Sequence, residues 1–347
     1  MRVTARQVTN SYIFNTNKNY GKVAEQFEKL QTGRGYTRLS QNIPSGKKAL
    51  KIRTAIYRNE QYKKNASAAN EQITAAEESL TGINEQIQNV KALAEKALNG
   101  TNTDETSRKI FQSTLEETKN AICDGLNVKY LDKYILGGTN GNKPFSVSED
   151  GNLTYNGVDV SKITLQDGVY TDANGNPVEM SEDTYIDIGL GLKLNGDTFD
   201  EKTVFKMSFS GLEWTGHGSS DITYKNADGA EVTETVSNNV FDLLTQMQSA
   251  LADNNTQKLG ALSDKLDKQY DNLLTGISTL GTRSAYLESV QTKLGDEATN
   301  LETYIKDYEG INDGEEITRL EEYNYAWLLT LKFGSQILPQ SLMDYIK

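Results

Sequence analysis

Two long heptad repeats, one on each side of the middle of the chain, most constrain what this sequence can fold into. From Ile73 to Ala97, and again from Leu259 to Tyr308, apolar residues recur at alternating steps of three and four, with two steps of seven between Leu280 and Leu294. Neither seam can stay in water, so we expect two long helices that pack against each other. The seams are Ile73, Ala76, Leu80, Ile83, Ile87, Val90, Ala94 and Ala97, and Leu259, Leu262, Leu266, Tyr270, Leu273, Ile277, Leu280, Leu287, Leu294, Ala298, Leu301, Ile305 and Tyr308.

The limits of the first helix and the start of a shorter one can also be read from the sequence. Ala49, Ile52 and Ile56 extend the first seam back towards Pro44, and Asn99-Gly100 is a typical helix end. A further apolar helical face follows, formed by Phe111, Leu115, Ile122 and Leu126. The sequence therefore predicts a mainly α fold, with an antiparallel helical-bundle or coiled-coil rod from residues 46–140 and 240–309.

The two ends of the chain carry weaker versions of the same pattern. Glycine-containing breaks at 33–35 and 310–314 separate them from the long helices. We expect residues 1–45 and 310–347 to form terminal coiled-coil assembly segments, disordered in the monomer and ordered when neighbouring copies cover them. The predicted assembly interface is Tyr20, Val23, Phe27, Leu30, Ile317, Leu320, Trp327, Leu331 and Leu338.

The charge of the chain is unevenly distributed. Its formal net charge is −12, yet residues 1–60 hold 12 Lys or Arg against 3 Asp or Glu, while residues 296–322 hold 10 acidic against 2 basic residues. The ends are electrostatically complementary, although separate solvated faces, or a targeting peptide within Met1–Ala24, would give the same counts. The acidic total argues against nucleic acid as the main partner. No apolar run long enough to span a bilayer, and no secretory signal, is present, so we expect no membrane partner.

Between the helical blocks the sequence consists of short β-branched and aromatic runs separated by Gly, Asn and Asp. This pattern predicts a β domain inserted at residues 141–239. The expected strands are Leu153–Tyr155, Tyr185–Ile188, Val204–Phe209, Ile222–Tyr224 and Val232–Val236, with Asp228-Gly229 as a hairpin turn before the last.

Residues that could carry catalysis or bind a cofactor are sparse. His217 is the single histidine, and no Gly-x-Ser-x-Gly elbow accompanies it. Cys123 is the single cysteine and lies on a helical apolar face, where we expect it to be buried. The segment from Asp172 to Asp183 resembles a calcium loop only superficially, since Pro177 occupies the position that needs Gly, and a turn explains it better. We expect no catalytic, cofactor-binding or metal site, and no enzymatic activity.

Several motifs resemble a known family. Leu30-Gln31-Thr32-Gly33-Arg34-Gly35, followed by Leu39-Ser40 and Pro44-Ser45-Gly46, is similar to the opening of bacterial flagellins and flagellin-like proteins, although Gln41-Asn42-Ile43 stands where an acidic pair is usual. The resemblance covers roughly residues 1–145 and 250–347. The motifs similar to its hook-associated members are Tyr134-Ile135-Leu136-Gly137-Gly138-Thr139 with Pro144-Phe145, Gly281-Thr282-Arg283 with Tyr286-Leu287-Glu288, and Leu338–Ile346.

The resemblance implies a structural subunit of the bacterial flagellum, secreted by type III export and placed at the hook–filament junction. The implied partners are other copies of the chain in a ring, a neighbouring hook-associated protein, flagellin and an export chaperone. The alternative within the family is flagellin itself, the filament subunit. From other classes, a surface adhesin with the β insert as its binding head and an enzyme using His217 stay open, and neither has support in the sequence.

Overall fold

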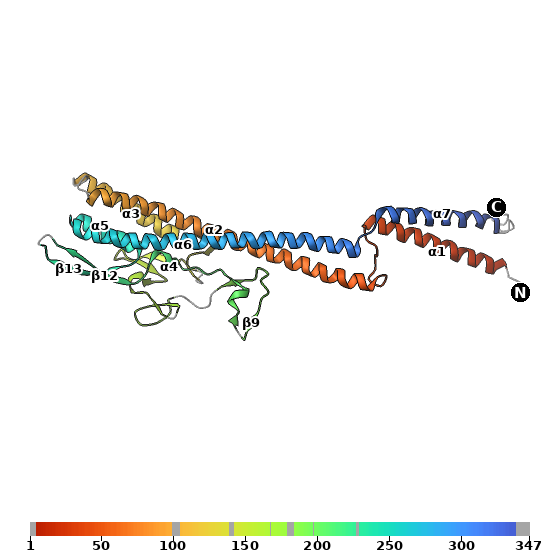
Figure 1. The fold of residues 1–347 in the computed structure, drawn as a ribbon, viewed down its shortest axis with the longest axis horizontal. Helices are drawn as coiled ribbons and strands as arrows, with labels where there is room; N and C mark the ends of the chain where they lie inside the picture. The colour runs from red at the N-terminus through yellow and green to blue at the C-terminus, as the bar shows by residue number, and fades with distance from the viewer. Residues whose placement is uncertain are drawn as a thin grey trace. The chain divides into compact units, whose positions relative to one another are not determined.

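The computed structural model describes residues 5–98, 105–138, 142–166, 168–178, 184–196, 198–226 and 229–337. It confirms the mainly α fold with an inserted sheet-containing region (Figure 1). The helices are α1 (Ala5–Thr32), α2 (Ile43–Leu98), α3 (Glu105–Leu126), α4 (Gly211–Thr215), α5 (Val240–Ala252), α6 (Thr256–Glu309) and α7 (Asp313–Ile337).

The chain divides into two compact units. Residues 1–61 and 294–347 form one, here called the terminal unit, and residues 62–293 form the other, the central unit. The predicted three-part division at 45/46, 140/141, 239/240 and 309/310 stays a prediction.

In the central unit, α2 and α6 run antiparallel with the predicted seams between them. Ile73, Leu80 and Ile87 on α2 are fully buried, as are Leu266, Leu273 and Leu280 on α6. Polar pairs flank this core and fix its register. They are Ser284 Oγ to Asn70 Oδ1 (2.8 Å), Gln88 Nε2 to Tyr270 OH (2.7 Å) and Lys91 Nζ to Asp267 Oδ1 (2.8 Å). The residue numbers of the partners rise along α2 while they fall along α6, so the two helices are antiparallel.

Helices α3 and α5 complete the core of the central unit. The predicted face of α3, including Phe111 and Leu115, is buried, and so is Cys123, whose thiol pKa is raised by that burial. The segment 240–309, predicted as part of one helical block, consists of α5 and α6, separated by a turn in which Asn254 has a φ of 54°. Figure 1 shows α3 and α5 beside the ends of α2 and α6.

The insert contains short strands in several small sheets. Only β3–β4–β5 has three strands, among the sheets of the described residues. Predicted strand Leu153–Tyr155 is β4, whereas the expected 185–188 and 204–209 shrink to Tyr185–Ile186 and Phe205–Lys206. Asp228 of the predicted turn lies outside the described residues. β1 (Lys129–Tyr130) and β2 (Lys133–Tyr134) precede the insert and form a short hairpin within the segment 46–140 predicted as helical rod. The strands of the insert are β3 (Phe145–Val147), β4, β5 (Val158–Asp159), β6 (Thr164–Gln166), β7 (Val169–Thr171), β8 (Tyr185–Ile186), β9 (Leu194–Asn195), β10 (Thr198–Phe199), β11 (Phe205–Lys206), β12 (Ser219–Lys225) and β13 (Glu231–Ser237).

The insert is anchored on α6 by specific contacts. Trp214 on α4 is buried and lies directly over Gly276, and Phe205 stacks on Tyr286 at 6.2 Å between ring centroids. The buried Lys265 ammonium donates to the Ser220 carbonyl and hydroxyl (both 2.9 Å) and to the Val236 carbonyl (3.1 Å). One lysine of α6 thereby holds both strands of the β12–β13 hairpin.

Candidate assembly surface

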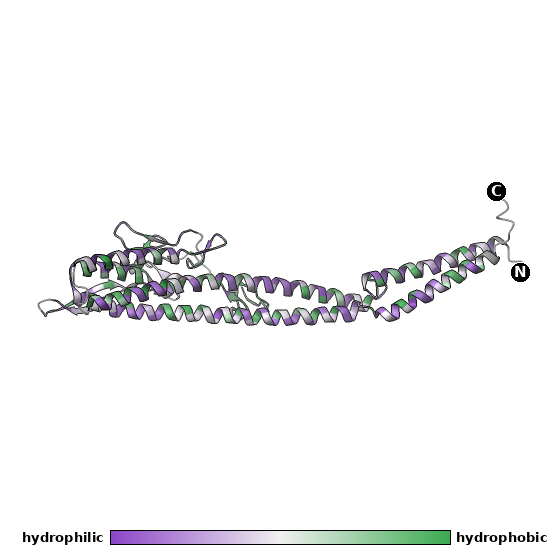
Figure 2. Ribbon diagram, turned by 90° about the horizontal axis from the view of Figure 1, so that it is seen from above, coloured by the Kyte–Doolittle hydropathy of each residue, from purple (hydrophilic) through white to green (hydrophobic). Residues whose placement is uncertain are grey.

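The terminal unit is built around the antiparallel pair of α1 and α7, which lie side by side in Figures 1 and 2. Asn19 Nδ2 donates to Thr330 Oγ1 (2.8 Å), and Gln26 Nε2 donates to the Glu316 carbonyl (3.0 Å) and to the Glu316 carboxylate. Between these two contacts, the Tyr20 ring meets Trp327 at 5.6 Å. The contact partners again run in opposite directions along the two helices.

The seam between α1 and α7 is largely polar. Its residues recur at steps of three and four, as in a coiled coil, but apolar side chains fill only part of it. Gln26 is 3% exposed and is held by hydrogen bonds instead of apolar packing. Figure 2 shows hydrophilic and hydrophobic residues mixed along both helices. The seam consists of Tyr12, Thr16, Asn19, Val23, Gln26 and Leu30 on α1 and Glu316, Leu320, Tyr323, Trp327, Thr330 and Gly334 on α7.

The nine residues predicted for assembly fall into three groups. Val23, Leu30, Leu320 and Trp327 are half-buried at the seam. Tyr20, Phe27, Ile317 and Leu331 are 40–60% exposed, so they remain open to a partner outside the pair. Leu338 lies outside the described residues. Their role in assembly stays a prediction.

The structure also exposes apolar residues that the prediction left out. Ile13 and Phe14 on α1 are 50% and 67% exposed, and Leu328 and Phe333 on α7 are 52% and 53% exposed. One signal was available in the sequence, because Ile13 precedes Tyr20 and Phe27 by multiples of seven and so shares their side of the helix. The outward apolar surface is therefore larger than the predicted stripe.

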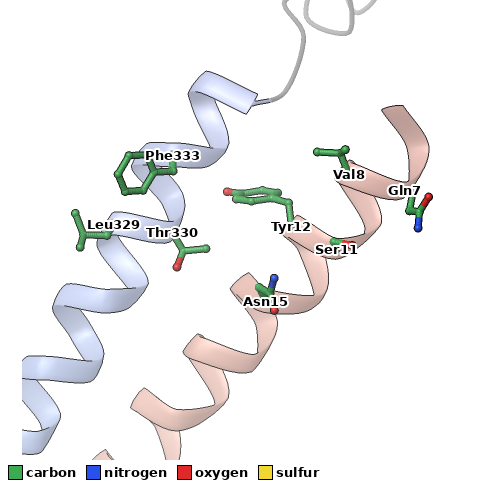
Figure 3. Close-up of a pocket in the computed structure, with 8 residues that line it drawn as sticks. All are labelled: Gln7, Val8, Ser11, Tyr12, Asn15, Leu329, Thr330 and Phe333. Carbon is green, nitrogen blue, oxygen red and sulfur yellow. The ribbon is translucent and has the colours of Figure 1, made fainter. Parts of the chain in front are cut away.

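A groove of about 530 Å³ lies between α1 and α7. Figure 3 shows the Tyr12 ring extending from α1 towards α7, with Val8 on its own helix and Phe333 across from it. The rest of the lining is Gln7, Ser11, Asn15, Leu329 and Thr330. Its mixture of apolar and small polar side chains, with no charged group among the lining residues, suits packing against protein rather than binding of an ion.

Glu309, at the end of α6, ties the linker between α1 and α2 to the rest of the terminal unit. Its carboxylate pairs with Arg53 on α2 and lies 3.8 Å from Arg34 Nε, and it accepts a hydrogen bond from the Tyr36 hydroxyl (3.3 Å). Gly35 N also donates to the Glu309 carbonyl (2.7 Å). Burial, and then the Glu309 charge, raise the pKa of the Tyr36 hydroxyl. This cluster holds the linker against the helix end.

The residues considered for chemistry occupy structural positions. His217 packs edge-on against Tyr170 at 5.1 Å, with Nδ1 3.3 Å from the Ile163 carbonyl. Asp172 accepts from the backbone N–H groups of Asn174 and Asn176 (both 2.8 Å), which closes a turn and lowers the pKa of its carboxyl, and Asp183 lies outside the described residues. Within the described ranges, His, Cys, Asp and Glu nowhere gather in threes around a possible metal position. None of the described helices is long and apolar enough to cross a membrane.

Comparison with known proteins places this geometry in a known fold. Residues 4–140 match the bacterial flagellin N-terminal helical region. A Vibrio parahaemolyticus protein described as flagellar hook-associated shares 15% identity, with a TM-score of 0.54 over 78% of this chain and 100% of that one. The flagellar junction protein FlgL of Legionella pneumophila shares 14% (TM-score 0.53, 76% and 100%), and FlgL of Xanthomonas campestris 15% (TM-score 0.52, 73% and 99%). A search of curated proteins finds no match.

Proposed function

We propose that this chain, which combines a flagellin-type N-terminal helical region with the fold of hook-associated FlgL structures, is a structural subunit at the junction between flagellar hook and filament. The observation that carries the proposal is the α1–α7 pair. It pairs the N-terminal helix with the C-terminal helix over a polar seam and leaves Ile13, Tyr20 and Phe27 exposed along one side of α1. Large exposed apolar side chains of this kind mark contact surfaces for other proteins.

The proposed role is mechanical and needs no catalysis or cofactor. Its partners would be other copies of the chain in a ring, a neighbouring hook-associated protein on one side and flagellin on the other. The subunit would leave the cell by type III export, escorted by a flagellar export chaperone, and its final place would be outside the cell in the flagellum. Solved structures of similar fold that are named as junction or hook-associated proteins support this assignment.

Flagellin, the filament subunit, is the second candidate, favoured by the match of residues 4–140 to the flagellin N-terminal region. The two roles differ in where the protein lies and in how many copies assemble.

Immunogold labelling with an antibody to the insert tests the choice. The antibody is raised against residues 142–239 and applied to intact cells and to filaments sheared from them. We expect one labelled band between hook and filament. Label along the whole filament would replace the junction role with that of flagellin, and label absent from flagella would overturn both.

A further inference from the structure

Within the terminal unit, the N-terminal part of α2 and the C-terminal part of α6 form a pair of helices that face each other. Ala49 on α2 and Leu294 on α6 are buried, and Lys48 Nζ lies 4.7 Å from the centre of the Tyr308 ring. The side chains on the outer sides of these two helices are exposed.

The outer side of α2 combines apolar and basic residues. Ile43, Leu50 and Tyr57 are 53%, 61% and 64% exposed and lie seven residues apart, so they form one ridge along the helix. Exposed basic residues share this side at helical spacing. We call this set the basic face; it consists of Ile43, Lys47, Leu50, Lys51, Tyr57 and Arg58.

The outer side of α6 in the same unit has the opposite charge. Tyr304, 53% exposed, lies between exposed acidic residues at spacings of three, seven and eight. We call this set the acidic face; it consists of Asp296, Glu297, Tyr304 and Asp307.

The two faces carry opposite charges, and both include exposed apolar or aromatic side chains. Lys48, Arg53 and Glu309 are engaged in contacts within the chain. The exposed charges that remain on the two faces are Lys47, Lys51 and Arg58 on α2 and Asp296, Glu297 and Asp307 on α6. Each face has exposed apolar or aromatic surface beside charges that are mostly of one sign, with exposed Glu60 on α2 and exposed Lys293 on α6 as the exceptions. A nucleic acid or an anionic membrane would fit the basic face alone and would leave the acidic face unexplained. A second copy of this chain satisfies both faces at once.

We propose that copies of this chain pack laterally by placing the basic face of one copy against the acidic face of the next. Because the two faces differ, the contact is heterologous, and its repetition generates a ring or a helical array instead of a closed dimer. Burial of Leu50 and Tyr57 against Tyr304 supplies the apolar part of the contact, and the charges set its register and orientation. The proposal rests on the proposed function, to which it adds the lateral partner surface.

Thiol cross-linking between copies tests the pairing directly. In a Cys123→Ala background, one variant carries Leu50→Cys and the other Tyr304→Cys, and both are expressed in the source bacterium as its copies of this protein. Isolated flagella and a concentrated mixture of the two purified variants are treated with a short bismaleimide. We expect a cross-linked dimer from the mixture and its loss when either variant is used alone. Equal cross-linking by the Leu50→Cys variant alone, or no dimer from either preparation, would overturn the proposal.

Charge reversal supplies a second, independent readout. The basic-face variant carries Lys47→Glu, Lys51→Glu and Arg58→Glu, and the acidic-face variant carries Asp296→Lys, Glu297→Lys and Asp307→Lys. Each variant alone places like charges together and should lose lateral association, whereas the two variants mixed, or all six changes in one protein, should restore it. Circular dichroism of each variant checks that the exposed substitutions leave the helices intact. Association of the basic-face variant alone at the wild-type level would contradict the pairing.

The two proposals fail separately. A band of label at the junction without the cross-link would reject the lateral contact and keep the function. A cross-link in the purified mixture, with no label on flagella, would do the reverse.

Discussion

Asp242 is a buried carboxylate that joins the insert to the first turn of α5. It accepts hydrogen bonds from Leu153 N (2.8 Å) and Ser237 Oγ (2.9 Å), and Asn239 caps the same helix by accepting from Phe241 N (2.9 Å). Burial outweighs these hydrogen bonds and raises the pKa of Asp242 to about 6. The insert therefore contacts the helical core through a carboxyl group that takes up a proton at a higher pH than an exposed aspartate does.

The raised pKa predicts a pH-dependent stability. As pH rises from about 4 to about 7, Asp242 ionises at lower pH in the unfolded chain than in the folded one, so its contribution to the free energy of unfolding falls by about 3 kcal/mol. Asp242→Asn removes this term, so the stability of the variant relative to wild type should rise over that interval. Urea unfolding followed by Trp214 fluorescence in a Trp327→Phe background measures it. The exposed Asp271→Asn is the control, and a pH-independent difference for Asp242→Asn would refute the prediction.

Gly276 is a position where a neighbouring side chain leaves no room for any residue larger than glycine. A Cβ at this position would lie 2.5 Å from Cγ of the buried Trp214 ring. Gly276→Ala should therefore destabilise the central unit by roughly 1–3 kcal/mol, despite the helix preference of Ala.

Gly295→Ala, in the same helix, is the matched control for this prediction. An added Cβ there meets nothing within 4 Å, so the change should stabilise by about 0.5–1 kcal/mol. Melting curves of the two variants give the comparison. An increase in Tm for Gly276→Ala would show that the Trp214 ring can shift away from an added Cβ without loss of stability.

At the scale of elements, the linker of residues 33–42 depends on Glu309. Glu309→Ala removes the carboxylate that pairs with Arg53, approaches Arg34 and accepts from Tyr36. We expect the free energy of opening the linker to fall by about 1 kcal/mol, so the open population rises roughly five-fold. The rate of tryptic cleavage after Arg34 and Arg38 reports the opening. Glu302→Ala, an exposed change on the same helix, should leave the rate unchanged, and an equal acceleration by both variants would argue against the cluster.

The elements also show what could and could not be predicted from the sequence. The α2 and α6 seams were predictable because apolar residues fill most of their positions, so the period shows in the sequence even though Ser284 and Gln291 interrupt it with hydrogen bonds to α2. The side of α1 that faces α7 was not, because Asn19 and Gln26 occupy seam positions through hydrogen bonds, while Phe27 lies outside the seam. In the insert, strands of two or three residues are shorter than the patterns that identify strands, and positive-φ positions such as Asn156 interrupt them.

At the scale of the whole molecule, the proposed function depends on the first helix. Deletion of residues 1–30 removes the α1 side of the seam and leaves the α7 side without a partner. We expect the truncated chain to be lost from flagella, because α7 without its partner α1 is an isolated helix of marginal stability. Electron microscopy of a strain carrying only this truncated protein makes the check. Filaments attached to hooks at the wild-type frequency would mean that α1 is dispensable for assembly.

The pairing of α1 with α7 has a consequence for the order in which the chain can fold. The residues joined by its hydrogen bonds are separated by 311 positions for Asn19 and Thr330 and by 290 for Gln26 and Glu316. Contacts of such high contact order carry the largest loop-closure entropy and form late. Because α1 precedes α7 in the chain by the whole of the central unit, α1 stays unpaired during synthesis until α7 has emerged, so the α1–α7 pair forms late in folding.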